Sequence, residues 1–251
     1  DFVLAMFREQ DPLTRAAARA ITGSELVARG IASAETDLAA DPELRTEIVQ
    51  ELAEIQHNLG ELAAARDHFT RLVEERAALD GTDSVPYAQS LAWLGATQLS
   101  IGERAAALPN IERASAILEA RLGPDDLRTA EANSTLARAL MLEGRLDDAL
   151  ALARRVHAVY AREKGAEHPE TLRRLFNVAV VLDQKDAPAE AEPILVELIA
   201  AWERRGESAH VSQVFPRNVL ADLLRRRGRL DEAGAQYETT LRLTREALGP
   251  D

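Results

Sequence analysis

The chain has 251 residues, of which 46% are hydrophobic, 29% charged and 4% aromatic; its formal net charge is −12 and it has no cysteine. This composition indicates a soluble globular protein with a core of small and aliphatic side chains, and it excludes disulfides, thiolate zinc sites and a cysteine nucleophile. The acidic balance argues against nucleic acid as the main ligand, because phosphate contacts need a basic face.

The first segment, residues 1–42, precedes the regular pattern that fills the rest of the chain. We expect it to form a helical lead-in or capping segment. No stretch approaches the roughly 18 apolar residues of a membrane span, and the longest apolar run, residues 193–202, contains Glu197. We therefore expect no membrane contact by this fragment itself.

From residue 43 onward a pattern returns every 42 residues, which predicts five repeats in one continuous array. Its reference position is a turn residue, seven residues after a small residue and five residues before an alanine. The turn residues are Gly60, Gly102, Gly144, Asp186 and Gly228; the small residues are Ala53, Gly95, Ala137, Ala179 and Ala221; the alanines are Ala65, Ala107, Ala149, Ala191 and Ala233. We place the repeats at about 43–84, 85–126, 127–168, 169–210 and 211–251.

Each repeat is predicted to be a helical hairpin. Small residues on both helices allow a close approach, and glycine easily adopts the left-handed conformation that ends a helix before a tight turn. We expect the turn at Asp186 to persist, because aspartate tolerates this conformation and Pro188 suits a first helical turn. Since one hairpin cannot bury its apolar face alone, the fold class is all-α, a right-handed superhelical solenoid of antiparallel helix hairpins.

The pattern of leucine and a small residue, then G-x-L-x-x-A, then an apolar residue resembles the tetratricopeptide repeat (TPR). The 42-residue period and the linkers at 122–129 and 165–172 resemble the kinesin-light-chain variety. The resemblance covers about residues 43–251. It implies an α-α superhelix that binds proteins or peptides.

The N-terminal phrase DFVLAMFREQDP, with Asp1, Phe2, Phe7, Asp11 and Pro12, resembles a segment of bacterial transmembrane serine/threonine protein kinases. In that family such a phrase opens a TPR domain outside the cytoplasm. The resemblance implies the non-catalytic sensory or interaction region of a bacterial kinase, in an extracytoplasmic (periplasmic) location. An interaction module of a cytoplasmic transcription regulator or other signalling protein remains the alternative.

We expect this fragment to have no enzymatic activity, no cofactor and no metal site. It contains no GxSxG, GxGxxG or kinase motif, and its five histidines form no close metal pair. His168, directly before Pro169 in a linker, is expected to be a structural cap or a plain loop residue rather than a ligand. The basic run at 225–229 ends a predicted helix, where positive charge is favourable, and is too short to indicate nucleic acid.

The TPR resemblance implies that the first helix of each hairpin faces the partner, and Asn177 matches a groove asparagine of kinesin-light-chain-type repeats. Met141, Phe176 and Val180 form either an exposed apolar patch or the seal between repeats, and Trp93 and Trp202 are expected in the core. The candidate groove residues are Gln50, Glu54, His57, Gln89, Ala92, Ala96, Leu99, Arg138, Met141, Phe176, Asn177, Val180, Asn218, Asp222 and Arg225.

The expected partner is a protein or peptide rather than nucleic acid. Both ends of the chain look cut, since ALGPD at the end resembles RLGPDD at 121–126. We read the chain as a piece of a longer protein. Uncapped apolar faces at solenoid ends would also allow a homodimer.

Overall fold

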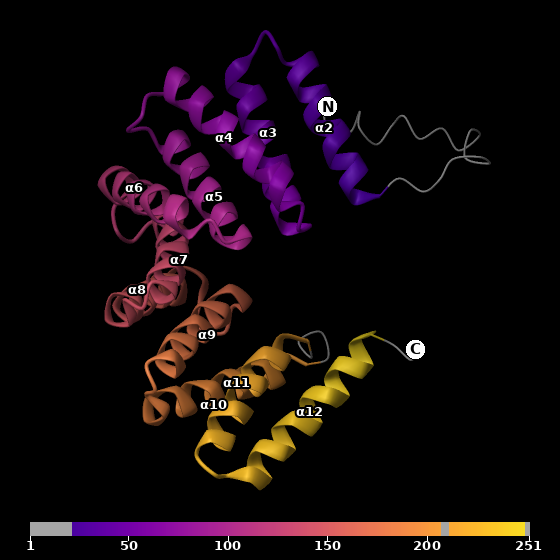
Figure 1. Ribbon diagram of the computed structural model, residues 1–251, viewed down its shortest axis with the longest axis vertical. Coiled ribbons are helices and arrows are strands. Elements are labelled where there is room, and N and C mark those ends of the chain that lie inside the picture. Colours follow the sequence, from indigo (N-terminus) through magenta and orange to yellow (C-terminus); the bar gives the residue numbers. More distant parts are fainter. Residues whose placement is uncertain (1–21, 207–210, 249–251) are drawn as a thin grey trace, which may run out of the picture. The chain divides into compact units, whose positions relative to one another are not determined.

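The structure is a computed structural model that describes residues 22–206 and 211–248. These ranges contain eleven α-helices, one 3₁₀ turn and no strand (Figure 1), which confirms the all-α prediction. The helices are α2 (Gly23–Asp37), α3 (Pro42–Asn58), α4 (Leu62–Leu79), α5 (Val85–Ile101), α6 (Arg104–Leu122), α7 (Leu127–Leu142), α8 (Leu146–Lys164), α9 (Pro169–Gln184), α10 (Pro188–Arg204), α11 (Val214–Arg226) and α12 (Leu230–Leu248), with η2 at Val211–Gln213.

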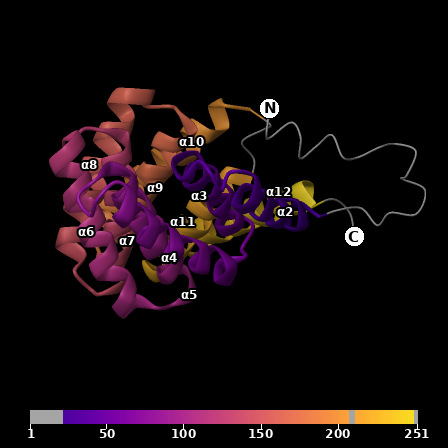
Figure 2. The same cartoon turned by 90° about the horizontal axis from the view of Figure 1, so that it is seen from above.

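The chain divides between Arg121 and Leu122 into two compact units. The described part of the first unit holds α2 to α6, and that of the second holds α7 to α12. Consecutive helices of each unit follow one another as hairpins joined by short turns (Figures 1 and 2). The division into five repeats stays a prediction.

The predicted left-handed turns are present at all five positions. Gly60, Gly102, Gly144 and Gly228 have φ between 76° and 89°, and Asp186 has φ 52°. Asp186 is the one non-glycine residue with positive φ in the described ranges. After each turn residue, the next backbone amide donates to the carbonyl five residues earlier, over 2.8–3.0 Å. This hydrogen bond satisfies a carbonyl that the helix end would otherwise leave unpaired.

The small residues bring the two helices of a hairpin together as predicted. A methyl group added at Gly95 of α5 would lie 2.5 Å from Ile111 Cγ1 and 3.2 Å from the Ala107 carbonyl oxygen of α6. Ala107 and the equivalent alanines of the other hairpins are at most 2% exposed. A larger residue on either side would therefore push the helices apart.

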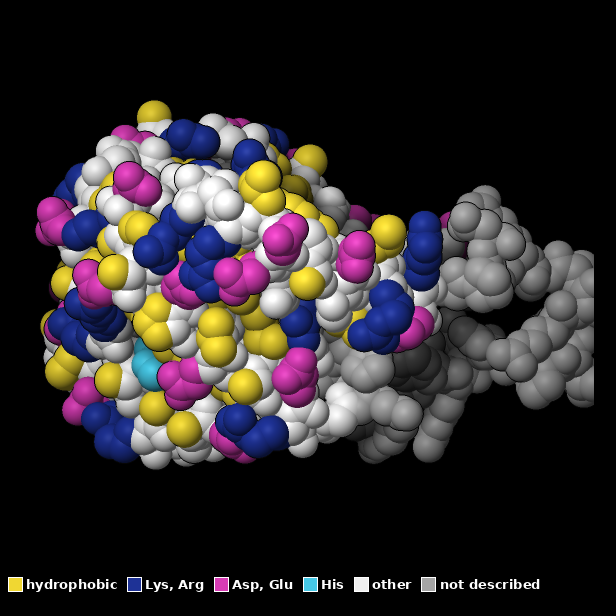
Figure 3. Space-filling view, turned by 90° about the horizontal axis from the view of Figure 1, so that it is seen from below, with side chains coloured by type: hydrophobic (Ala, Val, Ile, Leu, Met, Phe, Trp, Pro, Cys, Tyr) yellow, Lys and Arg dark blue, Asp and Glu magenta, His cyan; other side chains and the backbone are white. Residues whose placement is uncertain are grey.

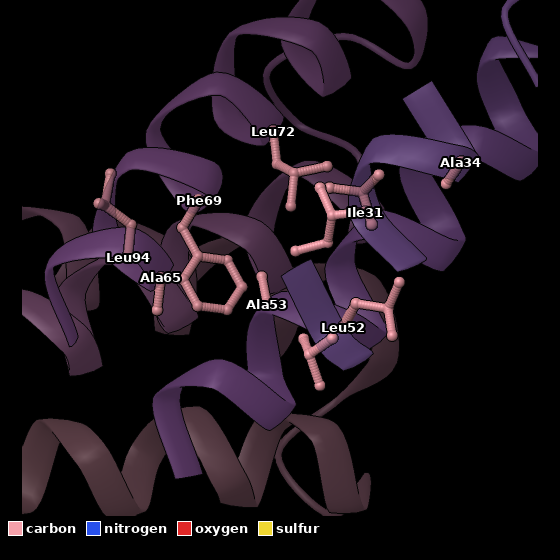
Figure 4. Close-up of a cluster of buried hydrophobic side chains, with 10 residues drawn as sticks. Ile31, Ala34, Leu52, Ala53, Ala65, Phe69, Leu72 and Leu94 are labelled. Atoms are coloured by element: carbon pink, nitrogen blue, oxygen red, sulfur yellow. The ribbon is translucent and has the colours of Figure 1, made fainter. Parts of the chain in front are cut away.

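The core of the first unit forms around Phe69 of α4, which is fully buried. Figure 4 shows its ring between Ala53 and Ala65, with Leu72 and Ile31 nearby. The Trp93 ring of α5 stacks on Phe69, with ring centroids 5.9 Å apart. This hairpin and the next one thus share one apolar core.

Helix α2 extends the repeat pattern further than the sequence analysis placed it. Val27, Ile31 and Ala34 of α2 are buried in the same core. Val27 precedes Phe69 by 42 residues and occupies the equivalent buried position. The N-terminal phrase, Asp1 to Pro12, lies outside the described residues.

Side-chain caps fix the starts of several first helices. Asp41, Ser84 and Asp126 accept backbone N–H bonds at the starts of α3, α5 and α7. His168 Nδ1 accepts from the Glu170 amide over 3.2 Å at the start of α9, so of the two expected roles it has that of a cap. These caps set where each first helix begins along the array.

Candidate interaction site

In the first unit, α3 carries three candidate groove residues, two of which contact side chains of α5. Ser90 Oγ donates to Gln50 Oε1 over 2.7 Å, and Gln50 Nε2 donates to Glu54 Oε1 over 3.3 Å. His57 Nδ1 lies 2.9 Å from Thr97 Oγ1. Gln50, Glu54 and His57 are half-buried, so part of each side chain remains open to a partner.

The candidates on α5 divide into two groups. Gln89 and Ala92 are half-buried, whereas Ala96 and Leu99 are each 8% exposed and lie in the core. Ala96 and Leu99 are therefore not available to a partner, because they lie on a buried side of α5. Trp93 packs between Phe69 and His57, whose ring meets it edge-on at 5.4 Å.

In the second unit, Asn177 of α9 faces α7. Its Nδ2 donates to Ser134 Oγ over 3.4 Å, and Arg174 NH1 donates to the same oxygen over 2.9 Å. The asparagine that the resemblance assigned to a peptide backbone is thus engaged within the protein, through one of its two amide protons. Its carbonyl oxygen remains an acceptor.

The remaining candidates of the second unit vary in exposure. Arg138 is exposed, and Met141, Val180 and Asn218 are half-buried. Asp222 accepts hydrogen bonds from Tyr237 over 2.7 Å and from Arg225 over 3.4 Å. Asp222 and Arg225 thus interact within their own hairpin.

A cavity of about 500 Å³ lies where α9, α10 and α11 meet, all within the second unit. Phe176, a candidate groove residue, is one of its walls. The cavity is lined by Pro169, Glu170, Leu172, Arg173, Phe176, Trp202, Ser212, Phe215 and Pro216.

Three of the side chains that line this cavity are aromatic. Trp202 is 8% exposed, Phe176 is half-buried, and Phe215 is 68% exposed, the highest value among the large hydrophobic side chains of the described residues. The chain has only 10 aromatic residues of the types Phe, Tyr and Trp, so three in one cavity is a strong concentration. A mostly apolar hollow of this size with a few polar groups is the usual form of a binding pocket.

Charged side chains of both signs stand at the cavity and next to its lining residues. Glu170 pairs with Lys164 and lies 3.9 Å from Arg173. Its pKa lies below the usual range because Lys164 donates a hydrogen bond to it and Arg173 and Arg174 stabilise its charge. Arg205 lies over the Trp202 ring, 5.7 Å from its centroid. The lining itself thus holds one carboxylate, Glu170, and one guanidinium, Arg173.

Of the residues that line the cavity, Phe176 was predicted as a site residue and the others were not. Trp202 was expected in the core, and it is buried, yet it also lines the cavity. Phe215 and Pro216 were not singled out. A comparison of residues one period apart marks Pro216 as unusual, because the preceding repeat has Arg174 there, but it does not reveal the cavity.

Other kinds of site find no support in the described ranges. They contain no cluster of His, Cys, Asp or Glu suited to a metal ion. The arginines of the basic run at 225–229 form ion pairs with acidic side chains. Arg226 pairs with Asp183, and Arg227 and Arg229 pair with Glu192. Figure 3 likewise shows basic and acidic side chains interspersed on one face. No helix in the described part of the chain is long and apolar enough to span a membrane.

Comparison with protein families identifies the repeats. Two family models, both described as tetratricopeptide repeat, match residues 122–204 and 217–251. No curated protein sequence gives a significant match.

Solved structures show the same fold. A putative kinesin light chain with nearly identical TPR-like repeats from Podosopora anserina is 22% identical, with a TM-score of 0.69 over 81% of this chain and 96% of that one. BtubC (BKLC) from P. vanneervenii is 15% identical, with a TM-score of 0.75 over 90% and 91%. A Rap protein complexed with Competence and Sporulation Factor is 14% identical, with a TM-score of 0.70 over 89% of this chain and 59% of that one. The chain therefore has the fold of kinesin-light-chain-like TPR proteins.

Proposed function

We propose that this chain is a scaffold that binds a protein or peptide segment and carries out no chemistry of its own. TPR folds are protein-interaction scaffolds, and one structure of similar fold is that of a Rap protein complexed with Competence and Sporulation Factor. Because a fold does not determine a function, the observation that carries the proposal is the open, aromatic-lined cavity of the second unit. A surface of this kind on a soluble protein marks an interaction site.

A peptide-library selection on the 251-residue protein tests this proposal. We expect enrichment of related sequences whose synthetic peptides bind in calorimetry. The matched control is a TPR-free helical protein of similar net charge, which should enrich none of them. A selection that returns no sequence with measurable binding would overturn the scaffold function for peptide ligands.

For the cellular context, we propose the sensory or interaction region of a bacterial serine/threonine kinase, held outside the cytoplasm. The support is the phrase from Asp1 to Pro12. In this view a ligand or a second copy changes the proximity of attached kinase domains. Sequencing the gene upstream of Asp1 tests it: kinase motifs and a membrane span are expected, whereas a DNA-binding or ATPase domain would favour the cytoplasmic alternative.

We also propose that the chain forms a homodimer through an end of the array. On α12, Leu230 is 65%, Tyr237 36% and Leu241 51% exposed. Tyr237 is one period after Leu195 and three periods after Ile111, both fully buried. Light scattering should show a dimer that Leu241→Lys weakens. A monomer at every concentration up to the millimolar range would rule the dimer out.

A further inference from the structure

The beginning of the described array exposes two helix faces that the later hairpins bury. Helix α2 is a second helix, because it ends at Asp37, one period before the end of α4 at Leu79. Each later second helix follows the first helix of its own hairpin. Within residues 22–206 and 211–248 no helix precedes α2, and α3 packs against it.

The first of these faces is marked by Gly23 of α2. It stands 42 residues before Ala65, at the position where each later hairpin has a small residue. The alanine at this position is at most 2% exposed in the five later hairpins, whereas Gly23 is exposed. The side of α2 that corresponds to the contact with a first helix is therefore accessible.

The second face is marked by Ile55 of α3, which is 44% exposed. The residues one, three and four periods later are at most 3% exposed; they are Thr97, Val181 and Leu223. Thr97 faces the first helix of the preceding repeat, since its Oγ1 lies 2.9 Å from His57 Nδ1 of α3. Ile55 therefore lies on the side of α3 that corresponds to a contact between two first helices.

Ile55 belongs to a strip of apolar side chains along α3 and its C-cap. The members follow one another at spacings of four, seven and four residues, which places them on one side of a helix. The strip consists of Leu44, Ile48, Ile55 and Leu59, of which Ile48 is half-buried and the other three are exposed. Leu59 also lies 4.0 Å from a methyl group added at Gly23, so the strip reaches the accessible side of α2. Exposed apolar residues that lie together in this way mark an interaction surface.

We propose that residues 2–7 of this chain cover the strip and take the place of a first helix before α2. These residues, FVLAMF, lie outside the described ranges and are all apolar. They hold two of the five phenylalanines and one of the two methionines of the chain. Because α3 spans Pro42–Asn58, the place one period earlier falls on residues 1–16, which include this segment.

Chain length and tethering favour this segment over a second copy. The fifteen residues from 8 to 22 reach up to about 50 Å when extended, and the 15 residues of α2 rise by only about 22 Å. The segment can therefore return along α2 to the strip of α3. Pro12 cannot stand inside a helix without breaking it, so the occupant ends before Pro12. A tethered segment has an effective concentration on the order of millimolar, which a second copy in dilute solution does not reach.

Cross-linking tests the contact, since the chain has no cysteine that would interfere. We expect Phe7→Cys with Ile55→Cys to be joined within one chain by a short bis-maleimide. Phe7→Cys with Leu79→Cys is the matched control, because Leu79 is similarly exposed at 42% and ends α4 at the far end of the hairpin. Equal cross-linking of the two pairs, or no product from the first pair, would overturn the proposal. Products that join two chains would assign the strip to a second copy and also overturn it.

Stability provides a second test that needs no cysteine. We expect Phe7→Ser and Ile55→Ser each to lower the folding equilibrium constant of the first unit by at least about fivefold, and the double variant to lower it little further, because both changes remove the same contact. Leu79→Ser is the control and should change the constant by less than about twofold. Urea unfolding in a Trp202→Phe background, with Trp93 as the reporter, measures all four variants. Effects of Phe7→Ser and Ile55→Ser that simply multiply, or an Ile55→Ser variant as stable as Leu79→Ser, would show that residues 2–7 do not cover the strip.

Discussion

The two units place their aromatic side chains to opposite effect. In the first unit, Trp93 stacks on Phe69 and meets His57 edge-on, so the rings close the junction between two hairpins. In the second unit, Trp202 and Phe215 border a cavity instead. The same repeat geometry therefore supports a sealed junction or an open one, and the side chain that faces the ring decides which.

The largest expected effect concerns the sealed junction. Phe69→Ala should lower the free energy of unfolding of the first unit by about 3–5 kcal/mol, because Phe69 is fully buried and leaves a cavity. Urea unfolding followed by Trp93 fluorescence measures it. The matched change, Phe215→Ala, should alter the stability of the second unit, followed by Trp202, by less than about 0.5 kcal/mol. Similar losses for both variants would contradict the distinction between the junctions.

A smaller effect is expected where two helices approach most closely. Gly95→Ala should destabilise the first unit by about 1–3 kcal/mol, because the added methyl group would contact Ile111 and the Ala107 carbonyl. Gly234 of α12 has no heavy atom within 4 Å of an added methyl group. Gly234→Ala should stabilise the second unit by about 0.5–1 kcal/mol through helix propensity. Thermal unfolding of both variants checks the opposite signs, and a neutral Gly95→Ala would show that the hairpin spacing is adjustable.

The backbone of the hairpins was predictable because its constraints are local. A left-handed residue must end each first helix, and glycine or aspartate meets that need at a fixed spacing, as at Gly60 and Asp186. The small residues were predictable for the same reason, since Gly95 is required by one nearby helix. Helix α2 was placed outside the pattern because Val27 is the one strong match that it offers.

The cavity was not predictable, because it depends on which side chains meet across a junction. Trp202 has the burial of a core residue, and the sequence analysis identified it as one. Its second role depends on the neighbouring helix α11, where Pro216 stands in the place that Arg174 occupies one period earlier. Such a pairing joins residues of two helices, and a periodicity analysis of one helix at a time does not compare them.

The smallest expected effect is a pH dependence of the stability of the first unit, which arises from His68 rather than from carboxylates. Burial, with the nearby charge of Arg71, lowers the pKa of His68, and Glu35 opposes this shift. The unfolded chain then binds the proton more readily, so this contribution to stability is complete above the unfolded pKa of about 6.5 and declines as the pH falls below it.

The pH range in which this stability is lost differs from the range expected for ion-paired carboxylates. The pKa of Glu170 is lowered by Lys164, so the stability from this pair is complete above its usual value of 4.5 and is lost only at lower pH. Urea midpoints from Trp93 fluorescence at pH 7.5 and pH 5.5 should therefore differ in the wild type and differ less in His68→Gln. An unchanged pH difference in His68→Gln would assign the effect to another group of the first unit, since Glu170 lies in the second and titrates below this range.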